Sequence, residues 1–149
     1  MIRIDIPATS ANLGSGFDSL GIALTMCNRV WMEEADEMKI TTTDKIKVPT
    51  DETNLIYWAA RHLYQICGKT LPGLHIIQEN NIPMARGLGS SSACIVAGIL
   101  GANRMLGSPM SQSDLINLAA QIEGHPDNTS PAISGGLVAS AMEGKRVKF

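Results

Sequence analysis

Residues 83–93 read Pro83-Met-Ala-Arg-Gly-Leu-Gly-Ser-Ser-Ser-Ala93, and they connect a predicted strand at 74–78 to a predicted helix at about 91–106. Gly87 and Gly89 allow tight turns and let backbone N–H groups approach a ligand closely. The serines lead into the start of the helix, where unpaired N–H groups and the positive end of the helix dipole attract anions. The segment therefore predicts a phosphate-binding loop.

This loop has an ordinary alternative, a glycine-rich turn with a serine N-cap. It is also not a P-loop, because no lysine follows the glycines. Gly98 and Gly101 inside the following helix favour the phosphate-binding interpretation. Each costs about 1 kcal/mol relative to alanine, which indicates close packing against a neighbouring element. A helix packed in this way would hold the loop rigidly.

The rest of the chain predicts one mixed α+β domain. Alternating isoleucines predict a first strand that ends at Pro7, and the small polar residues from Ala8 to Asp18 predict a loop. We expect strands at residues 2–6, 20–33, 39–43, 74–78 and 135–141. We expect helices at residues 53–68, 91–106 and 111–124, the last with a capping box at its start.

Composition excludes several classes of function. The chain has 149 residues, of which 44% are hydrophobic and 17% charged, with a net charge of −2. This balance is unsuited to nucleic acid or to an acidic membrane surface, and no apolar run is long enough to span a bilayer. The three cysteines form no C-x-x-C pair, which argues against a disulfide framework or a zinc site. We expect a soluble, cytoplasmic protein that binds neither nucleic acid nor membrane.

Three segments together resemble a known family. Pro83–Ala93 resembles the second signature of the GHMP kinases, which include galactokinase, homoserine kinase, mevalonate kinase and phosphomevalonate kinase. Pro7-Ala-Thr-Ser-Ala-Asn-Leu-Gly-Ser-Gly-Phe-Asp18 is similar to the first signature in its homoserine kinase form. Glu123-Gly-His-Pro-Asp-Asn128, followed by Pro131-Ala132 and Gly135-Gly136, is similar to a third homoserine kinase segment. Three motifs in this order are far more specific than any one alone.

The resemblance implies an N-terminal GHMP kinase domain over residues 1–149, with a fold like ribosomal protein S5 domain 2. It implies transfer of the γ-phosphate of ATP to the side-chain hydroxyl of L-homoserine, a step of threonine biosynthesis, with Mg²⁺ as cofactor. Members of the family are longer, and residues 145–149 look like a cut inside a β-rich segment. We therefore expect a truncated, poorly active fragment without the C-terminal ferredoxin-like domain, and an exposed apolar face that allows a homodimer.

The resemblance also implies roles for single residues. The expected ATP-binding residues are the loop and one residue at a helix start, namely Pro83, Met84, Ala85, Arg86, Gly87, Leu88, Gly89, Ser90, Ser91, Ser92, Ala93 and Asn54. The expected Mg²⁺ ligands are Ser90 and Glu123. The expected homoserine contacts are Asn12, Asp18, Asn128 and His125. Asp18 would orient the substrate and Asn128 would aim its hydroxyl, and no general base is assigned.

Ordinary structural roles stay open for these residues. Asn12 and Asp18 suit loop caps, Asn54 suits the first turn of a helix, and a lone histidine such as His125 is more often structural. Glu123 suits an exposed surface, although a carboxylate in the last turn of a helix opposes the dipole by about 0.3–1 kcal/mol. Two other functions also stay open, a GHMP kinase for a different alcohol and a non-catalytic nucleotide- or phosphate-binding module.

Overall fold

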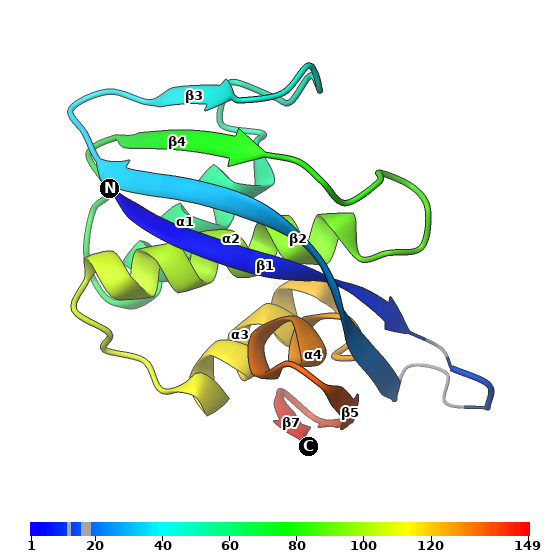
Figure 1. The fold of residues 1–149 in the computed structure, drawn as a ribbon. Helices are drawn as coiled ribbons and strands as arrows, with labels where there is room; N and C mark the ends of the chain where they lie inside the picture. Colours follow the sequence, from blue (N-terminus) through cyan, green and yellow to red (C-terminus); the bar gives the residue numbers. More distant parts are fainter. Residues whose placement is uncertain (12, 16–18) are drawn as a thin grey trace.

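The computed structural model describes residues 1–11, 13–15 and 19–149 (Figure 1). Within these residues the main sheet has the strand order β1-β2-β4-β3, and β5 pairs with the first part of β2. Strands β3 and β4 are parallel, whereas the other pairs are antiparallel. The strands of this sheet are β1 (Ile2–Ala11), β2 (Leu20–Glu34), β3 (Lys39–Thr42), β4 (Leu74–Glu79) and β5 (Leu137–Ala139).

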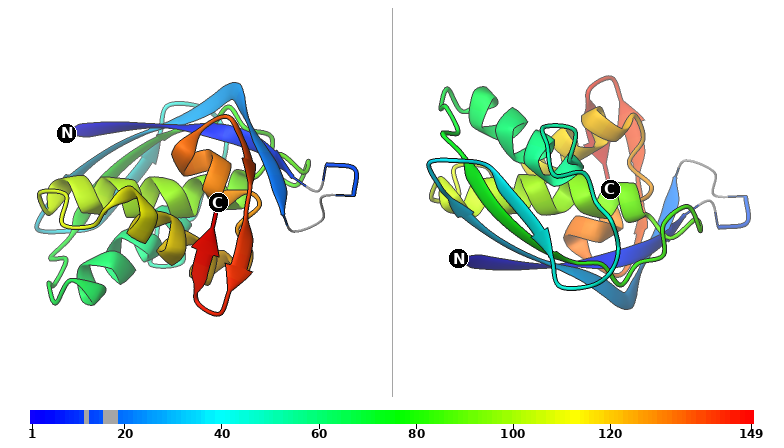
Figure 2. Two further views of the ribbon diagram at one scale, coloured as in Figure 1. Left: turned by 90° about the horizontal axis from the view of Figure 1, so that it is seen from below. Right: turned by 90° about the horizontal axis from the view of Figure 1, so that it is seen from above.

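Helices cover one face of this sheet, as the views along its edge show (Figure 2). They are α1 (Leu55–Ile66), α2 (Ser90–Met105), α3 (Gln112–Glu123) and α4 (Thr129–Ser134). Strand β1 shows the two-layer arrangement, because Ile4, Ile6 and Ala8 are buried whereas Arg3 and Asp5 are exposed. The predicted α+β class is confirmed. In the described part of the chain, no helix is both long and apolar enough to cross a membrane.

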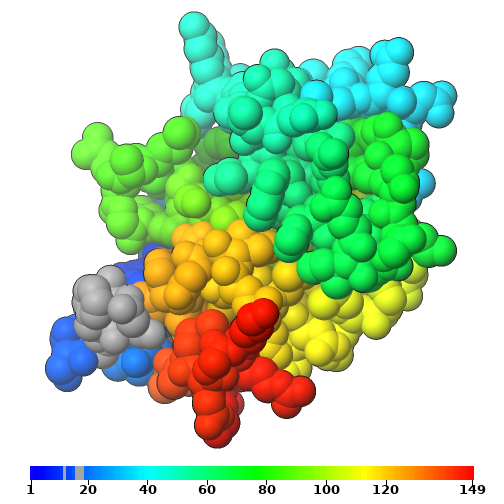
Figure 3. All heavy atoms as spheres, turned by 180° about the vertical axis from the view of Figure 1, so that it is seen from behind, coloured from blue at the N-terminus to red at the C-terminus, as the bar shows by residue number. Residues whose placement is uncertain are grey.

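A small hairpin follows the main sheet. It consists of β6 (Ala141–Glu143) and β7 (Arg146–Lys148). Val147 packs on α3, and its N–H donates to the side-chain oxygen of Asn117 at 2.6 Å. Seen from behind, α1, α3 and this hairpin lie side by side at the surface (Figure 3). Neither the hairpin nor the six-residue helix α4 was predicted as a separate element.

The prediction that the first strand ends at Pro7 is wrong. β1 continues to Ala11, Pro7 pairs with Cys27, and the register shifts between Pro7 and Thr9. Among the described residues, only β2 borders β1 in the sheet. Proline tolerates an edge position or a bulge, because its backbone nitrogen has no hydrogen to donate and none is required there. Thr9 therefore lies in a strand rather than in the predicted loop.

The predicted helices are present, and their ends follow the expected signals. Ser111 and Asp114 form the predicted capping box of α3, which ends at Gly124 in the left-handed conformation. α1 stops shortly before Gly68, also left-handed, and its N-cap is Asn54. The N-cap of α2 is Gly89 and not a serine, so the alternative of a serine N-cap is wrong.

Close packing of α2 is confirmed at both of its internal glycines. A Cβ at Gly98 would lie 2.3 Å from the carbonyl oxygen of Ile56 in α1. A Cβ at Gly101 would lie 2.3 Å from the sulfur of Met32 in β2. α2 is therefore held against a helix on one side and the sheet on the other, and the loop before it starts from a fixed base.

We expect Gly98→Ala to destabilise the chain more than Gly101→Ala does. The new methyl group at residue 98 meets backbone, which cannot move aside, whereas at residue 101 it meets a flexible side chain. Alanine gains about 1 kcal/mol of helix propensity at both positions. In urea unfolding, we expect the free energy of unfolding to fall by about 2–3 kcal/mol for Gly98→Ala and by about 1 kcal/mol or less for Gly101→Ala. Equal losses, or the reverse order, would contradict this packing.

Candidate functional site

The loop before α2 is anchored where it leaves the sheet. The buried side chain of Asn28 in β2 accepts hydrogen bonds from the N–H groups of Asn81 at 2.7 Å and Ile82 at 2.8 Å. From Pro83 to Gly87 the chain then lies exposed on the surface. The loop is therefore held at its base and open along its length.

Its far end is fixed by Gly89. This residue has a φ of 69°, and a Cβ there would lie 2.2 Å from the hydroxyl oxygen of Thr9. The N–H of Thr9 donates to the carbonyl of Leu88 at 3.0 Å. Because Gly89 offers no side-chain cap, the first N–H groups of α2 keep their capacity to bind an anion. This geometry suits the binding of an anion at the start of α2.

The loop, the end of α3 and the start of α4 enclose a hollow of about 200 Å³. Its lining residues are Pro83, Ala85, Arg86, Gly87, Leu88, Gly89, Ser90, Ser91, Ser92, Glu123 and Asn128. The hydroxyl of Ser92 donates to the carboxylate of Glu123 at 2.8 Å. The structure thus brings together Ser90, Glu123 and Asn128, which come from two separate motifs.

A second pocket of about 300 Å³ adjoins the loop. It shares Ala85, Ser90 and Ser91 with the first hollow. Its other lining residues are Lys47, Val48, Pro49, Thr53, Asn54, Leu55, Gln78, Asn80, Ile82, Met84 and Cys94. Burial raises the pKa of the Cys94 thiol to about 11, so the thiol stays neutral at physiological pH. A largely apolar pocket beside the N–H groups at the start of a helix has the chemistry to hold a nucleobase and its attached phosphates.

Asn54 lines this pocket and caps α1. Its side-chain oxygen accepts from the N–H groups of Ile56 and Tyr57, at 3.0 and 3.3 Å. Its side-chain nitrogen donates to the Pro49 carbonyl at 2.9 Å and to the Gln78 side chain at 2.8 Å. Both hydrogens and the oxygen are therefore in use, and a polar contact with a bound base would replace one of these bonds.

The turn between α3 and α4 is held by a carboxylate that the sequence reasoning missed. Asp127 is 1% exposed, lies 2.5 Å from Nδ1 of His125, and accepts the N–H of Asn128 at 3.1 Å. A Cβ at Gly21 in β2 would overlap the carbonyl oxygen of Asp127. His125 thus contacts the residue that positions Asn128. The one sequence feature that could have pointed to Asp127 was its position between the predicted site residues His125 and Asn128.

Three predicted site residues remain. Asn12 and Asp18 lie outside the described residues, so their predicted contacts with the substrate stay predictions. Arg86 is exposed on the loop.

A metal ion would have few side-chain ligands in this site. Among the described residues, no three His, Cys, Asp or Glu side chains gather to hold a metal ion. Mg²⁺ commonly uses one or two carboxylates together with water and substrate phosphates, and Glu123 and Ser90, which line the same hollow, are the residues that could contribute to such a site.

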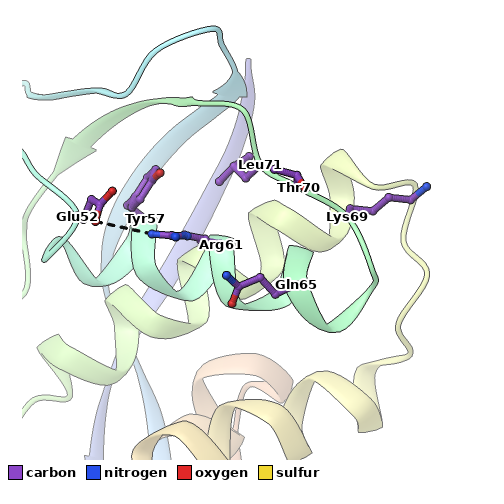
Figure 4. A pocket seen from close by; sticks show the side chains of 7 residues that line it. All are labelled: Glu52, Tyr57, Arg61, Gln65, Lys69, Thr70 and Leu71. Carbon is purple, nitrogen blue, oxygen red and sulfur yellow. Dashed lines mark ion pairs between the residues drawn. The ribbon is translucent and has the colours of Figure 1, made fainter.

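A further hollow lies on α1 and the segment after it (Figure 4). Glu52 and Arg61 form an ion pair of 3.7 Å there, and Lys69 points away from both. Its polar groups do not converge on one point, and it is separate from the loop. The two adjoining hollows at the start of α2 are therefore the better candidate site.

This arrangement is that of an α+β domain with a glycine-rich loop, but no P-loop, at the start of a helix. The model of the GHMP kinases N terminal domain matches residues 54–136, and the chain belongs to this family. The match includes the loop, the whole lining of the hollow beside Glu123 and Asn128, and the helices α1 to α4. The resemblance drawn from the three sequence motifs is confirmed at the level of the family.

Comparison with individual proteins extends the similarity to nearly the whole chain. The chain is 46% identical to the homoserine kinase of Petrotoga mobilis over 152 residues, which cover the whole chain and 50% of that protein. The structure of homoserine kinase from Cytophaga hutchinsonii matches 93% of the chain and 47% of its own, with 32% identity and a TM-score of 0.81. Mevalonate kinase from Methanococcus jannaschii shares the fold at 15% identity, covering 99% of this chain and 55% of its own, with a TM-score of 0.75. The chain spans about half the length of the curated relatives it matches.

We expect Gly89→Ala to cost more stability than the matched change Gly87→Ala. Both glycines have a φ near 70°, so each variant carries the strain of a left-handed alanine, about 1–2 kcal/mol. Only at Gly89 does the new methyl group also collide, with Thr9, whereas Gly87 faces open space. A further loss of about 1–3 kcal/mol is expected for Gly89→Ala in urea unfolding. If the two variants unfold alike, the loop does not rest on β1 as described.

Proposed function

We propose that this protein transfers the γ-phosphate of ATP to the side-chain hydroxyl of L-homoserine, forming O-phospho-L-homoserine, a step of threonine biosynthesis. The observation that carries the proposal is the junction of two hollows at Ser90 and Ser91. One hollow suits a nucleobase, and the other presents helix amides, a carboxylate and an amide side chain. The homoserine kinases among its relatives support the choice of acceptor.

The residues of the site suit phosphoryl transfer, which depends mainly on positioning and on stabilising charge. The N–H groups at the start of α2 would hold the phosphates, since they carry the positive end of the dipole. Glu123, held by Ser92, would bind Mg²⁺ together with Ser90, and this ion when bound neutralises charge on the phosphates. Asn128 lines the same hollow next to Gly89, and the acceptor hydroxyl would arrive beside it.

The acceptor itself would be held by the first motif. A carboxylate such as Asp18 pairs with the ammonium group of an amino acid, and an amide such as Asn12 bonds a hydroxyl. His125 would support the same side of the site through Asp127. No general base is needed in this scheme. In a loose transition state the acceptor hydroxyl keeps its proton until late in the transfer of the phosphoryl group.

The proposal includes a cytoplasmic location and a homodimer. Cys27, Cys67 and Cys94 are all free thiols, as in a reducing compartment. Leu137 exposes 65% of its surface and would provide an apolar contact for a second copy.

The test is phosphoryl transfer by the protein at the full length that its gene encodes. We expect ADP release with Mg-ATP and L-homoserine, matched by O-phospho-L-homoserine in mass spectrometry. With mevalonate or galactose as acceptor, kcat/KM should be lower by at least about 100-fold, because these alcohols leave the polar groups that receive an amino acid unpaired. A preference for another alcohol would replace the proposed substrate. Nucleotide binding without transfer to any acceptor would favour a binding module.

A further inference from the structure

Thr9 connects two parts of the candidate site that lie far apart in the sequence. It is completely buried in β1. Its backbone N–H donates to the carbonyl of Leu88 in the loop, and its hydroxyl donates to Oδ1 of Asn128 at 2.8 Å. The same hydroxyl occupies the space that a side chain at Gly89 would need. One residue therefore contacts the phosphate-binding loop and the amide beside it.

In the structure, the hydroxyl of Thr9 bonds the oxygen end of the Asn128 amide. An asparagine side chain carries an acceptor oxygen and a donor nitrogen that point in different directions. Thr9 occupies the oxygen, and no described residue accepts a hydrogen bond from the nitrogen. Asn128 also lines the hollow beside Gly89 and Ser90. Among the described residues, nothing therefore competes with a ligand in that hollow for the N–H₂ group of this amide.

We propose that Thr9 is a positioning residue that holds Asn128 with its N–H₂ group toward the reacting phosphate and acceptor oxygens. This inference rests on the proposed function. Asn128 then acts as a hydrogen-bond donor to developing negative charge, and not as an acceptor of the proton of the substrate hydroxyl. Because Thr9 also bonds Leu88, the donor and the phosphate-binding amides keep a fixed spacing, which transfer to a defined acceptor requires.

A purely structural role for the hydroxyl is the alternative. A buried threonine often serves only to satisfy a neighbouring polar group, and its loss would then lower stability without affecting turnover in the folded enzyme. The two roles predict different values of kcat for a variant of Thr9 that lacks the hydroxyl. Only the positioning role predicts that the effect of this variant on kcat depends on the presence of Asn128.

The kinetic test uses the full-length protein with Mg-ATP and L-homoserine. Thr9→Val has a similar shape but lacks the donor, so we expect kcat to fall about 10–100-fold while KM for ATP changes less than about threefold. Thr9→Ser keeps the hydroxyl and should restore most of kcat. In the background of Asn128→Ala, adding Thr9→Val should lower kcat by less than about twofold, since both changes remove the same contact. Additive losses, or an unchanged kcat in Thr9→Val, would overturn the proposal.

Asn128→Asp provides a second variant that keeps the hydrogen bond from Thr9. A carboxylate at this position accepts from the hydroxyl but has no N–H to donate. We expect a loss of kcat at least as large as in Thr9→Val. A retained kcat would show that the residue works as an acceptor, which excludes the donor role.

A readout without turnover separates this proposal from the proposed function. If the wild-type protein phosphorylates no homoserine, the function fails, but the orientation of Asn128 can still be measured. Its side-chain N–H₂ signals in a ¹H–¹⁵N NMR spectrum are assigned by their absence in Asn128→Ala. We expect them to shift or broaden in Thr9→Val and to stay in place in Thr9→Ser. Signals unchanged in Thr9→Val would overturn the role of Thr9 in either case.

Discussion

The contact between Gly89 and Thr9 determines where α2 begins and what its first turn can bind. A glycine in the left-handed conformation lets the loop backbone rest on the hydroxyl of a buried strand residue. In the described part of the chain no N-cap side chain bonds the start of the helix, which lines a hollow. Bare N–H groups at a helix start would be a cost in an ordinary helix, but they are the useful feature of an anion site.

The surrounding packing keeps this first turn in place. Gly98 and Gly101 seat α2 against α1 and β2, and Asn28 holds the chain just before the loop. On the opposite side, Ser92 compensates Glu123 for its unfavourable place at the end of α3 by donating a hydrogen bond. These contacts hold the base of the site, whereas the loop between Pro83 and Gly87 is exposed.

Features encoded locally could be predicted from the sequence. The helices followed from the spacing of apolar residues, and the capping box at Ser111 from its own four residues. The close packing of α2 followed from glycines where a helix normally avoids them. The loop was predicted because glycine conformations and helix ends are local properties as well.

Features that depend on distant residues could not be predicted. Continuation of β1 beyond Pro7 depends on pairing with β2, and the role of Thr9 depends on a residue 119 positions further along the chain. Asp127 is inconspicuous in the sequence because its burial arises only in the folded chain, where its backbone carbonyl lies against Gly21 of a distant strand. Asn54 was placed in a first turn, whereas as an N-cap it also ties α1 to Pro49 and Gln78, contacts that only the folded chain creates.

The central claim, that the first amides of α2 hold nucleotide phosphates, can be measured directly in the wild-type protein. Mg-ADP is titrated into ¹⁵N-labelled protein, and the shift of each backbone amide is followed by NMR. The account predicts that the largest shifts fall on residues 87–92, with Gly89 and Ser90 among them. Saturation with nucleotide that leaves these amides unmoved, while amides elsewhere on the surface shift, would contradict it.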